Sequence, residues 1–296
     1  MEHENQFDPL SIISIIALVA VDAVIWHDII VSRPPASMHA HFLDVGQGDA
    51  ELLAFPDGAK VMTDAGPPNG EAVNDLQNIL PFGDRYIDIA VISHPQLDHF
   101  GGYTGLLDQY SIGAFIYNGR DDTPGVSAWP ELLAKIRAKH IPLITLGRGD
   151  AIRMAGGEID FLSPNRDFDK SAELNDTAFV EFARSDDFRV LLTADTGFNV
   201  ENFLLQTKIN LRADVLKVGH HGSKYSSGSG FLKAVDPRAA VIEVGAHNTY
   251  GHPSKDALQR IASSTSAIIF RTDRDKSVEM WKENGILHAR KADEGS

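Results

Sequence analysis

The sequence contains no cysteine, which excludes disulfide bonds and thiolate metal ligands. Positive charge is also scarce: 27 Lys and Arg face 41 Asp and Glu, giving a formal net charge of −14. This balance excludes a general attraction for nucleic acid, because phosphate binding depends on local Lys and Arg. Any metal must therefore be held by His, Asp, Glu or neutral oxygens, and any polyanionic substrate must be bound locally. The 43% hydrophobic content of the 296 residues suffices for a large buried core.

Lys and Arg are missing altogether from an apolar run near the N-terminus, residues 10–31. Its length matches the ~20 residues that span a membrane as a helix, although Asp22 would cost roughly 2.5 to 3.5 kcal/mol at mid-bilayer. A buried amphipathic helix and a signal peptide are the alternatives. No basic residue precedes the run and SRPPASM is a poor cleavage site, which disfavours the signal peptide. We expect a tail, a membrane anchor and a linker in residues 1–37, a globular domain in 38–290 and a short tail in 291–296.

From Met38 onward, strand-like and helix-like segments alternate. Residues 38–65 contain three short extended runs separated by Gly and Pro clusters, which is typical of hairpins. Residues 87–94 are nearly all apolar and β-branched, as expected of a strand covered on both faces, and residues 129–140 have a helical pattern. The second half repeats this order of strands followed by helices. The pattern predicts an α/β fold in which two sheets pack face to face with helices outside.

Polar side chains follow the predicted strands repeatedly, at the point where each strand ends. A single His is more often a surface or core residue than a metal ligand, but five strand ends carrying His or Asp form a pattern. Loops at the carboxyl ends of strands are where α/β folds collect functional groups. The residues concerned are Asp64, His94, Asp98, His99, Asp195, His220, His221 and His252.

These residues lie in motifs that resemble the successive motifs of the metallo-β-lactamase superfamily, in the variety found in the soluble domain of the ComEC competence DNA-uptake family. The resemblance covers about residues 39–275 and implies a four-layer αββα sandwich with a metal site at one edge of the two sheets. No multi-helix channel accompanies it here, so we expect a singly anchored relative with an N-terminal transmembrane helix. The motifs are FLDVGQGDAELL, VMTDAGP, VISHPQLDHFGG, VLLTADTG, ADVLKVGHHGSKYSS and YGHPS.

The resemblance also implies a ligand set. Asp98, His99 and His252 would form one metal position, and Asp195 would bridge to a second that includes His94. Imidazole and carboxylate ligands without thiolate suit Zn²⁺ or Mn²⁺, bound as one or two ions.

Three further residues receive supporting roles from the same resemblance. His220 or His221 would complete the coordination or protonate a leaving group. Asp64 would orient the ligands, a role that neighbouring carboxylates often take in metal sites.

Two positions depart from the pattern of the superfamily. Gln96 stands where His or Asp is usual, and a neutral amide is a weaker ligand than either. Another expected His is replaced in ELNDTAFVEF, which offers Asn175 and Asp176. One metal position is therefore short of ligands, while the other looks intact.

Three other motifs carry weaker signals. GQGD, residues 46–49, is either a phosphate-binding loop or a tight hairpin between strands. In HHGSKYSSG, Lys224 would grip a phosphate, or the segment is simply a solvated loop. We assign no chemistry to FRTDRDK, residues 270–276.

The combined interpretation is a membrane-anchored, metal-dependent hydrolase, a phosphodiesterase or nuclease that uses a metal-activated water held by Asp98. A hydrolase of lactones, thioesters or β-lactams is one alternative, because the fold hosts both chemistries. A degenerate binding module is the other, and Gln96 is its best support. We expect a phosphodiester or nucleic-acid substrate and a single-pass membrane protein. Arg33 after the span favours a cytoplasmic domain, whereas the ComEC resemblance implies the extracytoplasmic side, which we prefer.

Overall fold

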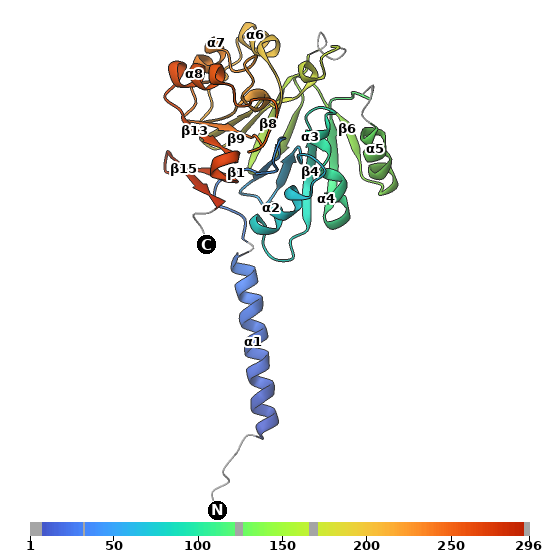
Figure 1. Ribbon diagram of the computed structural model, residues 1–296. Helices are drawn as coiled ribbons and strands as arrows, with labels where there is room; N and C mark the ends of the chain where they lie inside the picture. Colours follow the sequence, from blue (N-terminus) through green and yellow to red (C-terminus); the bar gives the residue numbers. More distant parts are fainter. Residues whose placement is uncertain (1–7, 32, 122–126, 166–170, 293–296) are drawn as a thin grey trace, which may run out of the picture.

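The computed structural model describes residues 8–31, 33–121, 127–165 and 171–292, and two sheets packed face to face form its centre (Figure 1). The first sheet has the strand order β15–β14–β1–β2–β3–β4–β5–β6. Its strands are β1 (His39–Phe42), β2 (Glu51–Ala54), β3 (Lys60–Thr63), β4 (Tyr86–Ile92), β5 (Ser111–Tyr117), β6 (Leu143–Thr145), β14 (Val278–Glu283) and β15 (Ile286–Lys291).

The second sheet has the order β13–β12–β11–β10–β9–β8–β7. Its strands are β7 (Ala151–Met154), β8 (Gly157–Ser163), β9 (Val180–Ser185), β10 (Phe188–Leu192), β11 (Val215–Lys217), β12 (Ala239–Ile242) and β13 (Ile268–Arg271). Alternate residues of both sheets fill the space between them, because side chains on a strand point to opposite faces. Phe42, Phe55, Phe161 and Phe188 are fully or almost fully buried in this central core.

Helices cover the outer face of each sheet, which completes the four-layer αββα sandwich expected from the sequence (Figure 1). The first sheet is covered by α2 (Glu71–Ile79), α3 (Leu97–Phe100), α4 (Tyr103–Gln109) and α5 (Ala128–Ala138). The second is covered by α6 (Phe198–Gln206), α7 (Ser229–Val235) and α8 (Lys255–Ser264). The short helices η1 (Leu174–Thr177), η2 (Gly219–Gly222) and α9 (Thr272–Asp275) lie in connecting loops.

The N-terminal helix α1 (Pro9–Val31) projects away from the sandwich (Figure 1). Its segment Pro9–Trp26 has a mean hydropathy of 2.2 and none of it is buried within the protein. The helix is therefore long and apolar enough to cross a membrane, and it is not the buried amphipathic helix that the sequence left as an alternative.

The strand pairing brings the polar loops to one edge of the sandwich. β3 runs parallel to β4, and β10, β11 and β12 run parallel to one another, so their carboxyl ends point the same way. The 43–50 segment is not a tight hairpin, because β1 ends at Phe42 and β2 begins at Glu51. Its backbone reaches this edge instead, where Asp49 N donates to Asp98 O at 3.2 Å.

Candidate metal centre

Asp64 connects the two buried histidines that follow β4. Its Oδ2 lies 2.7 Å from Nδ1 of His99, and it accepts hydrogen bonds from the backbone N–H and the hydroxyl of Ser93. The same hydroxyl lies 2.9 Å from Nδ1 of His94, and the two imidazole rings are 4.2 Å apart between centroids. With Nδ1 of each ring engaged, Nε2 is left for a metal, and neither Nε2 has a hydrogen-bond partner among the described residues.

His221 is held in the same way from the second sheet. Its Nδ1 donates to the carbonyl oxygen of Glu243 at 2.9 Å and lies 3.2 Å from Oδ1 of Asp49. That contact fixes the tautomer with a free Nε2. This Nε2 lies 3.4 Å from Oδ1 of Asp195 and 3.7 Å from Oδ2 of Asp98.

Asp195 lies between the histidines of the two sheets. Its Oδ2 is 3.4 Å from Nε2 of His99 and 3.8 Å from Nε2 of His220. One ligand atom each of Asp98, His99 and His221 also lie within 4.8 Å of one another. We call Asp98, His99, His221 and Asp195 the central cluster.

The central cluster fits a divalent cation. Nε2 of His99, Nε2 of His221 and Oδ1 of Asp195 are buried and lack hydrogen-bond partners within the part of the chain that the structure describes. Leaving such groups unpaired is costly, and a cation among them would satisfy all three. The set of imidazole and carboxylate ligands suits Zn²⁺ or Mn²⁺.

The electrostatics of the cluster also favour a cation. Burial alone would lower the pKa of His99, but the carboxylates of Asp195 and Asp64 outweigh it and raise the pKa well above its usual value. Burial likewise opposes the effect at His221, whose pKa Asp195 and Asp49 raise to about 10. By contrast, burial and then the neighbouring His99 lower the pKa of His94 to about 4. The carboxylates therefore favour positive charge at the positions of His99 and His221.

Gln96 and Asn175 are bonded to each other beside His94. Gln96 Nε2 donates to Asn175 Oδ1 at 2.7 Å, and Asn175 Nδ2 lies 3.3 Å from Nδ1 of His220. The two amides thus occupy the region where the resemblance expects two further ligands. Of the residues assigned to that metal position, only His94 and Asp195 remain.

His252 lies beside His220, and its Nδ1 is buried without a hydrogen-bond partner among the described residues. The ring of His252 lies 5.6 Å from that of His220, and His252 belongs to none of the groups of three ligand atoms found among the described residues. His221 lies with Asp98 and His99 in one such group, and the ligand role of His252 stays a prediction. Lys224 is exposed, with its ammonium group 4.9 Å from the ring centroid of Tyr225.

The sequence motifs did not predict a buried charged network beneath the central cluster. The ammonium group of Lys217 is fully buried, contacts Asp49 Oδ2, and donates to Ala194 O at 2.9 Å. Beside it, burial and neighbouring carboxylates raise the pKa of Glu51 well above its usual value and that of Glu243 to about 8. Two features of the sequence could have indicated this network. They are the Lys within the apolar run VLKVG and the Glu residues within predicted strands.

The GQGD segment packs against the loop after β4 that carries Asp98 and His99. A Cβ on Gly48 would lie only 2.2 Å from the carbonyl oxygen of Asp98. This close approach requires glycine and places Asp49 beside the Nδ1 atoms of His99 and His221, at 3.7 and 3.2 Å. The segment therefore helps to hold the rings of His99 and His221 in place, on the side away from their Nε2 atoms.

Solved structures with the same architecture identify the fold. The metallo-β-lactamase fold protein YhfI from Bacillus subtilis matches with a TM-score of 0.56 at 12% identity, over 86% of this chain and 100% of that chain. The chain has a metallo-β-lactamase fold. Igni18, a metallo hydrolase from Ignicoccus hospitalis, matches over 83% of this chain and 100% of that chain, with a TM-score of 0.53 and 15% identity. Zn²⁺-bound PqqB from Methylobacterium extorquens matches with a TM-score of 0.53 at 11% identity, over 79% of this chain and 98% of that chain.

Sequence relatives confirm the ComEC-like resemblance, although no protein-family model matches the chain. ComE operon protein 3 of Bacillus subtilis is 26% identical over 266 residues, 82% of this chain and 33% of that protein. Competence protein ComA of Neisseria gonorrhoeae is 27% identical over 249 residues, which are 84% of this chain and 33% of that protein. Recombination protein 2 of Haemophilus influenzae is 29% identical over 230 residues, which are 76% of this chain and 26% of that protein. The metallo-β-lactamase-fold chain thus spans about a third or less of the length of these relatives.

Proposed function

We propose that this protein is a membrane-anchored phosphodiesterase or nuclease that holds one divalent metal tightly in the central cluster. The convergence of two unpartnered Nε2 atoms with the carboxylates of Asp98 and Asp195 carries the proposal. Relatives named as competence and recombination proteins favour a nucleic-acid substrate over an acyl compound. His94 and Asp195 alone would hold a second ion weakly.

The chain's own residues supply distinct functions around the metal. When bound, a divalent metal lowers the pKa of water towards ~7 and polarises a phosphoryl oxygen. The side chain of Asp98 is 32% exposed, so it can accept a hydrogen bond from the attacking water while facing the central cluster. His99 and His221 present Nε2 because Asp64 and Glu243 engage Nδ1.

His220 is the proton donor to the leaving group in this proposal. Its side chain is 35% exposed and lies beside Asp195. The amide of Asn175 faces Nδ1 of His220 at 3.3 Å, and an amide N–H donated there leaves the ring proton on Nε2. His220 therefore carries its donor on Nε2, 3.8 Å from Oδ2 of Asp195 at the partly exposed margin of the site, whereas His221 is committed to the metal.

Exposed side chains beyond His220 fit a single-stranded nucleic acid. The ring of Tyr250 stacks on His252, with centroids 6.0 Å apart, and is 70% exposed. Bases stack on such aromatic rings with little sequence preference. Lys224, on the loop after η2, would contact the phosphate backbone, which matters in a protein with a net charge of −14.

Helix α1 anchors the domain in this proposal. Residues 1–37 form the anchor and linker, residues 38–290 the hydrolase and residues 291–296 a tail. The resemblance of the sequence motifs to the ComEC family implies that the hydrolase lies on the extracytoplasmic side of the membrane, and we place it there.

The full chain in detergent tests the function. We expect protein reloaded with Mn²⁺ or Zn²⁺ to hydrolyse bis(p-nitrophenyl) phosphate and single-stranded DNA faster than lactones, thioesters or β-lactams. Asp98→Asn should abolish this activity, and Lys224→Ala should lower it by roughly 10- to 1000-fold without loss of metal, with Lys208→Ala as the control. Faster turnover of a lactone would favour the acyl hydrolase, and metal binding without any hydrolysis would favour a binding module.

A further inference from the structure

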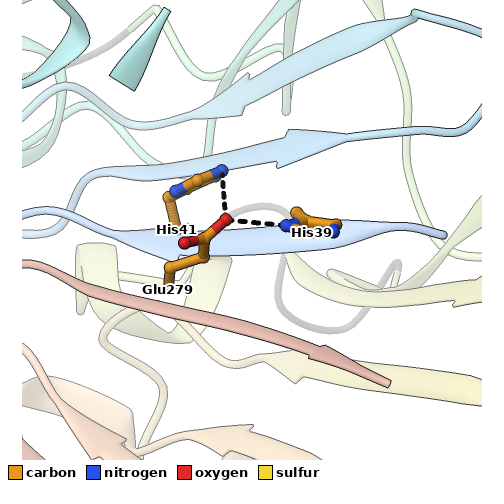
Figure 2. A group of neighbouring side chains, drawn as sticks. All are labelled: His39, His41 and Glu279. Atoms are coloured by element: carbon orange, nitrogen blue, oxygen red, sulfur yellow. Dashed lines mark hydrogen bonds and ion pairs between the residues drawn. The ribbon is translucent and has the colours of Figure 1, made fainter. Parts of the chain in front are cut away.

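A separate group of metal-ligating side chains lies on the outer face of the first sheet. His39 and His41 belong to β1, and Glu279 belongs to the neighbouring strand β14 (Figure 2). His39 and His41 share a face because they are two residues apart on one strand. Glu279 is the direct cross-strand partner of His41, so its carboxylate projects between the two imidazoles. None of these residues contributes to the central cluster.

The three ligand atoms are close enough for one ion. Nδ1 of His39 lies 2.7 Å and Nε2 of His41 lies 3.9 Å from the same Glu279 oxygen, Oε1, and the three atoms lie within 4.8 Å of one another. Bonds of about 2.0 to 2.1 Å in a tetrahedral site put ligand atoms roughly 3.3 Å apart. Small side-chain rotations would therefore open the existing triangle around a cation.

The surroundings hold these side chains in place. The ring of His39 stacks on Trp281 at 5.2 Å between centroids, and Trp281 stacks in turn on His288 at 5.2 Å. Arg290 contacts Oε2 of Glu279, which leaves Oε1 for an ion and keeps the carboxylate charged. Supporting contacts of this kind are typical of metal ligands.

An ordinary ion pair does not account for His41. Its ring is almost buried, and burial lowers its pKa to about 4, so it is neutral near pH 7. Its 3.9 Å separation from Glu279 exceeds a hydrogen bond, and His41 donates no other side-chain hydrogen bond to the residues that the structure describes. A neutral imidazole beside a carboxylate is, however, the state in which both bind a metal.

The group opens onto a cavity. His39, His41 and Glu279 line a cavity of about 690 Å³ together with Arg33 of the linker and Lys60 of β3. An ion bound by two imidazoles and one carboxylate would therefore keep a coordination position open to water or a small anion.

We propose that His39, His41 and Glu279 form a peripheral site for a divalent cation of the Zn²⁺ class. The ion would join β1, which directly follows the linker from α1, to β14, 240 positions further along the chain at the His39–Glu279 contact. The ion would thus hold β1, the strand that is connected to the membrane helix, in place against β14.

Metal content of the full chain in detergent tests this site. Equilibrium dialysis against micromolar Zn²⁺, followed by mass-spectrometric metal analysis, should show one ion per chain fewer in His41→Gln and in Glu279→Gln than in the wild type. His288→Gln, a half-buried histidine on the adjacent strand, is the matched control and should lose none. Phosphodiester hydrolysis should persist in His41→Gln, which separates this site from the central cluster.

A second measurement guards against misfolding of these variants. In a His99→Ala background, Zn²⁺ should raise the melting temperature, and adding His41→Gln should remove that rise. Equal Zn²⁺ content in wild type, His41→Gln and Glu279→Gln would overturn the peripheral site. An unchanged Zn²⁺-dependent rise in the double variant would do the same. Either result would leave the proposed hydrolase function untouched.

Discussion

At the scale of single residues, the centre depends on which nitrogen of each histidine is free. Asp64 and the carbonyl of Glu243 engage Nδ1 of His99 and His221, and this choice of partner presents Nε2 to the metal position. The neighbouring position differs, because its two amides engage other groups: Gln96 Nε2 donates to Asn175 Oδ1, and Asn175 Nδ2 faces Nδ1 of His220.

Replacing Gln96 tests that asymmetry. Gln96→His should raise the metal content by up to one ion per chain above that of the wild type, because an imidazole would join His94 and Asp195. Metal analysis after dialysis measures the change. Gln96→Ala is the matched control and should lose little metal compared with Asp98→Ala. Equal losses from Gln96→Ala and Asp98→Ala would mean that the amide is itself a ligand.

Glu181 gives a second residue-scale prediction, concerning stability. Burial raises its pKa to about 8, although the hydroxyl of Thr63 donates to it at 3.0 Å. Between about pH 4.5 and 8, the unfolded chain releases this proton while the folded protein keeps it. The free energy of unfolding should therefore fall as pH rises, by up to about 1.4 kcal/mol per pH unit.

Glu181→Gln should remove this dependence, since an amide does not titrate. Its melting temperature should exceed that of the wild type at pH 8, and the advantage should shrink towards pH 5. Glu283→Gln, at an exposed position, is the control and should show no such trend. An identical difference between Glu181→Gln and wild type at both pH values would contradict the assignment.

At the scale of elements, the centre is assembled by loops that follow the ends of parallel strands. These loops contain strained backbone. Asp64, Ala194, His220 and His221 all have positive φ, between 43° and 53°, a region that side chains rarely adopt. Such strain is retained where surrounding structure over-determines it, commonly at functional sites. The 43–50 loop, packed against the loop that carries Asp98 and His99, is part of that surrounding structure.

Gly48→Ala should disturb this packing. Its methyl group would meet the carbonyl oxygen of Asp98, so the loop that carries Asp98 and His99 must shift. We expect metal affinity to fall by about 10- to 100-fold, as when other supporting groups of metal sites are lost. Titration with Zn²⁺ measures it. Gly105→Ala, where the nearest atom lies 4.0 Å from the new methyl group, should bind metal normally. Normal affinity in Gly48→Ala would show that the loops are not coupled.

At the scale of the whole molecule, α1 and the sandwich carry separate tasks. The sandwich has its cores between the sheets and beneath the outer helices, whereas none of the Pro9–Trp26 segment is buried. Every ligand of the central cluster lies beyond residue 37.

Removing residues 1–37 should therefore give a soluble, folded domain that still binds metal. Size-exclusion chromatography without detergent, circular dichroism and metal analysis measure the outcome. The full chain should require detergent under the same conditions. Aggregation of the truncated protein, with the full chain soluble without detergent, would show that α1 belongs to the core.

Local patterns in the sequence predicted the fold class, and the resemblance of its motifs implied the edge at which the site forms. Short extended runs and helical patterns predicted the strands and helices. His and Asp at successive strand ends predicted a functional site there, and the resemblance implied that it binds metal. Hydrophobic periodicity is a local property, so these features needed no knowledge of distant contacts. The missing cysteines restricted the metal ligands to imidazole, carboxylate and neutral oxygen groups.

Tertiary structure alone decided which of these residues meet. His221 lies 3.7 Å from Asp98, because the left-handed turn at η2 directs its ring inward. Lys217 contacts Asp49, which is 168 positions away in the sequence, and His39 contacts Glu279, which is 240 positions away. Such pairings follow from strand order and register, which depend on how the two sheets close over a common core. No local pattern in the sequence encodes that closure, because it is a property of the assembled sheets.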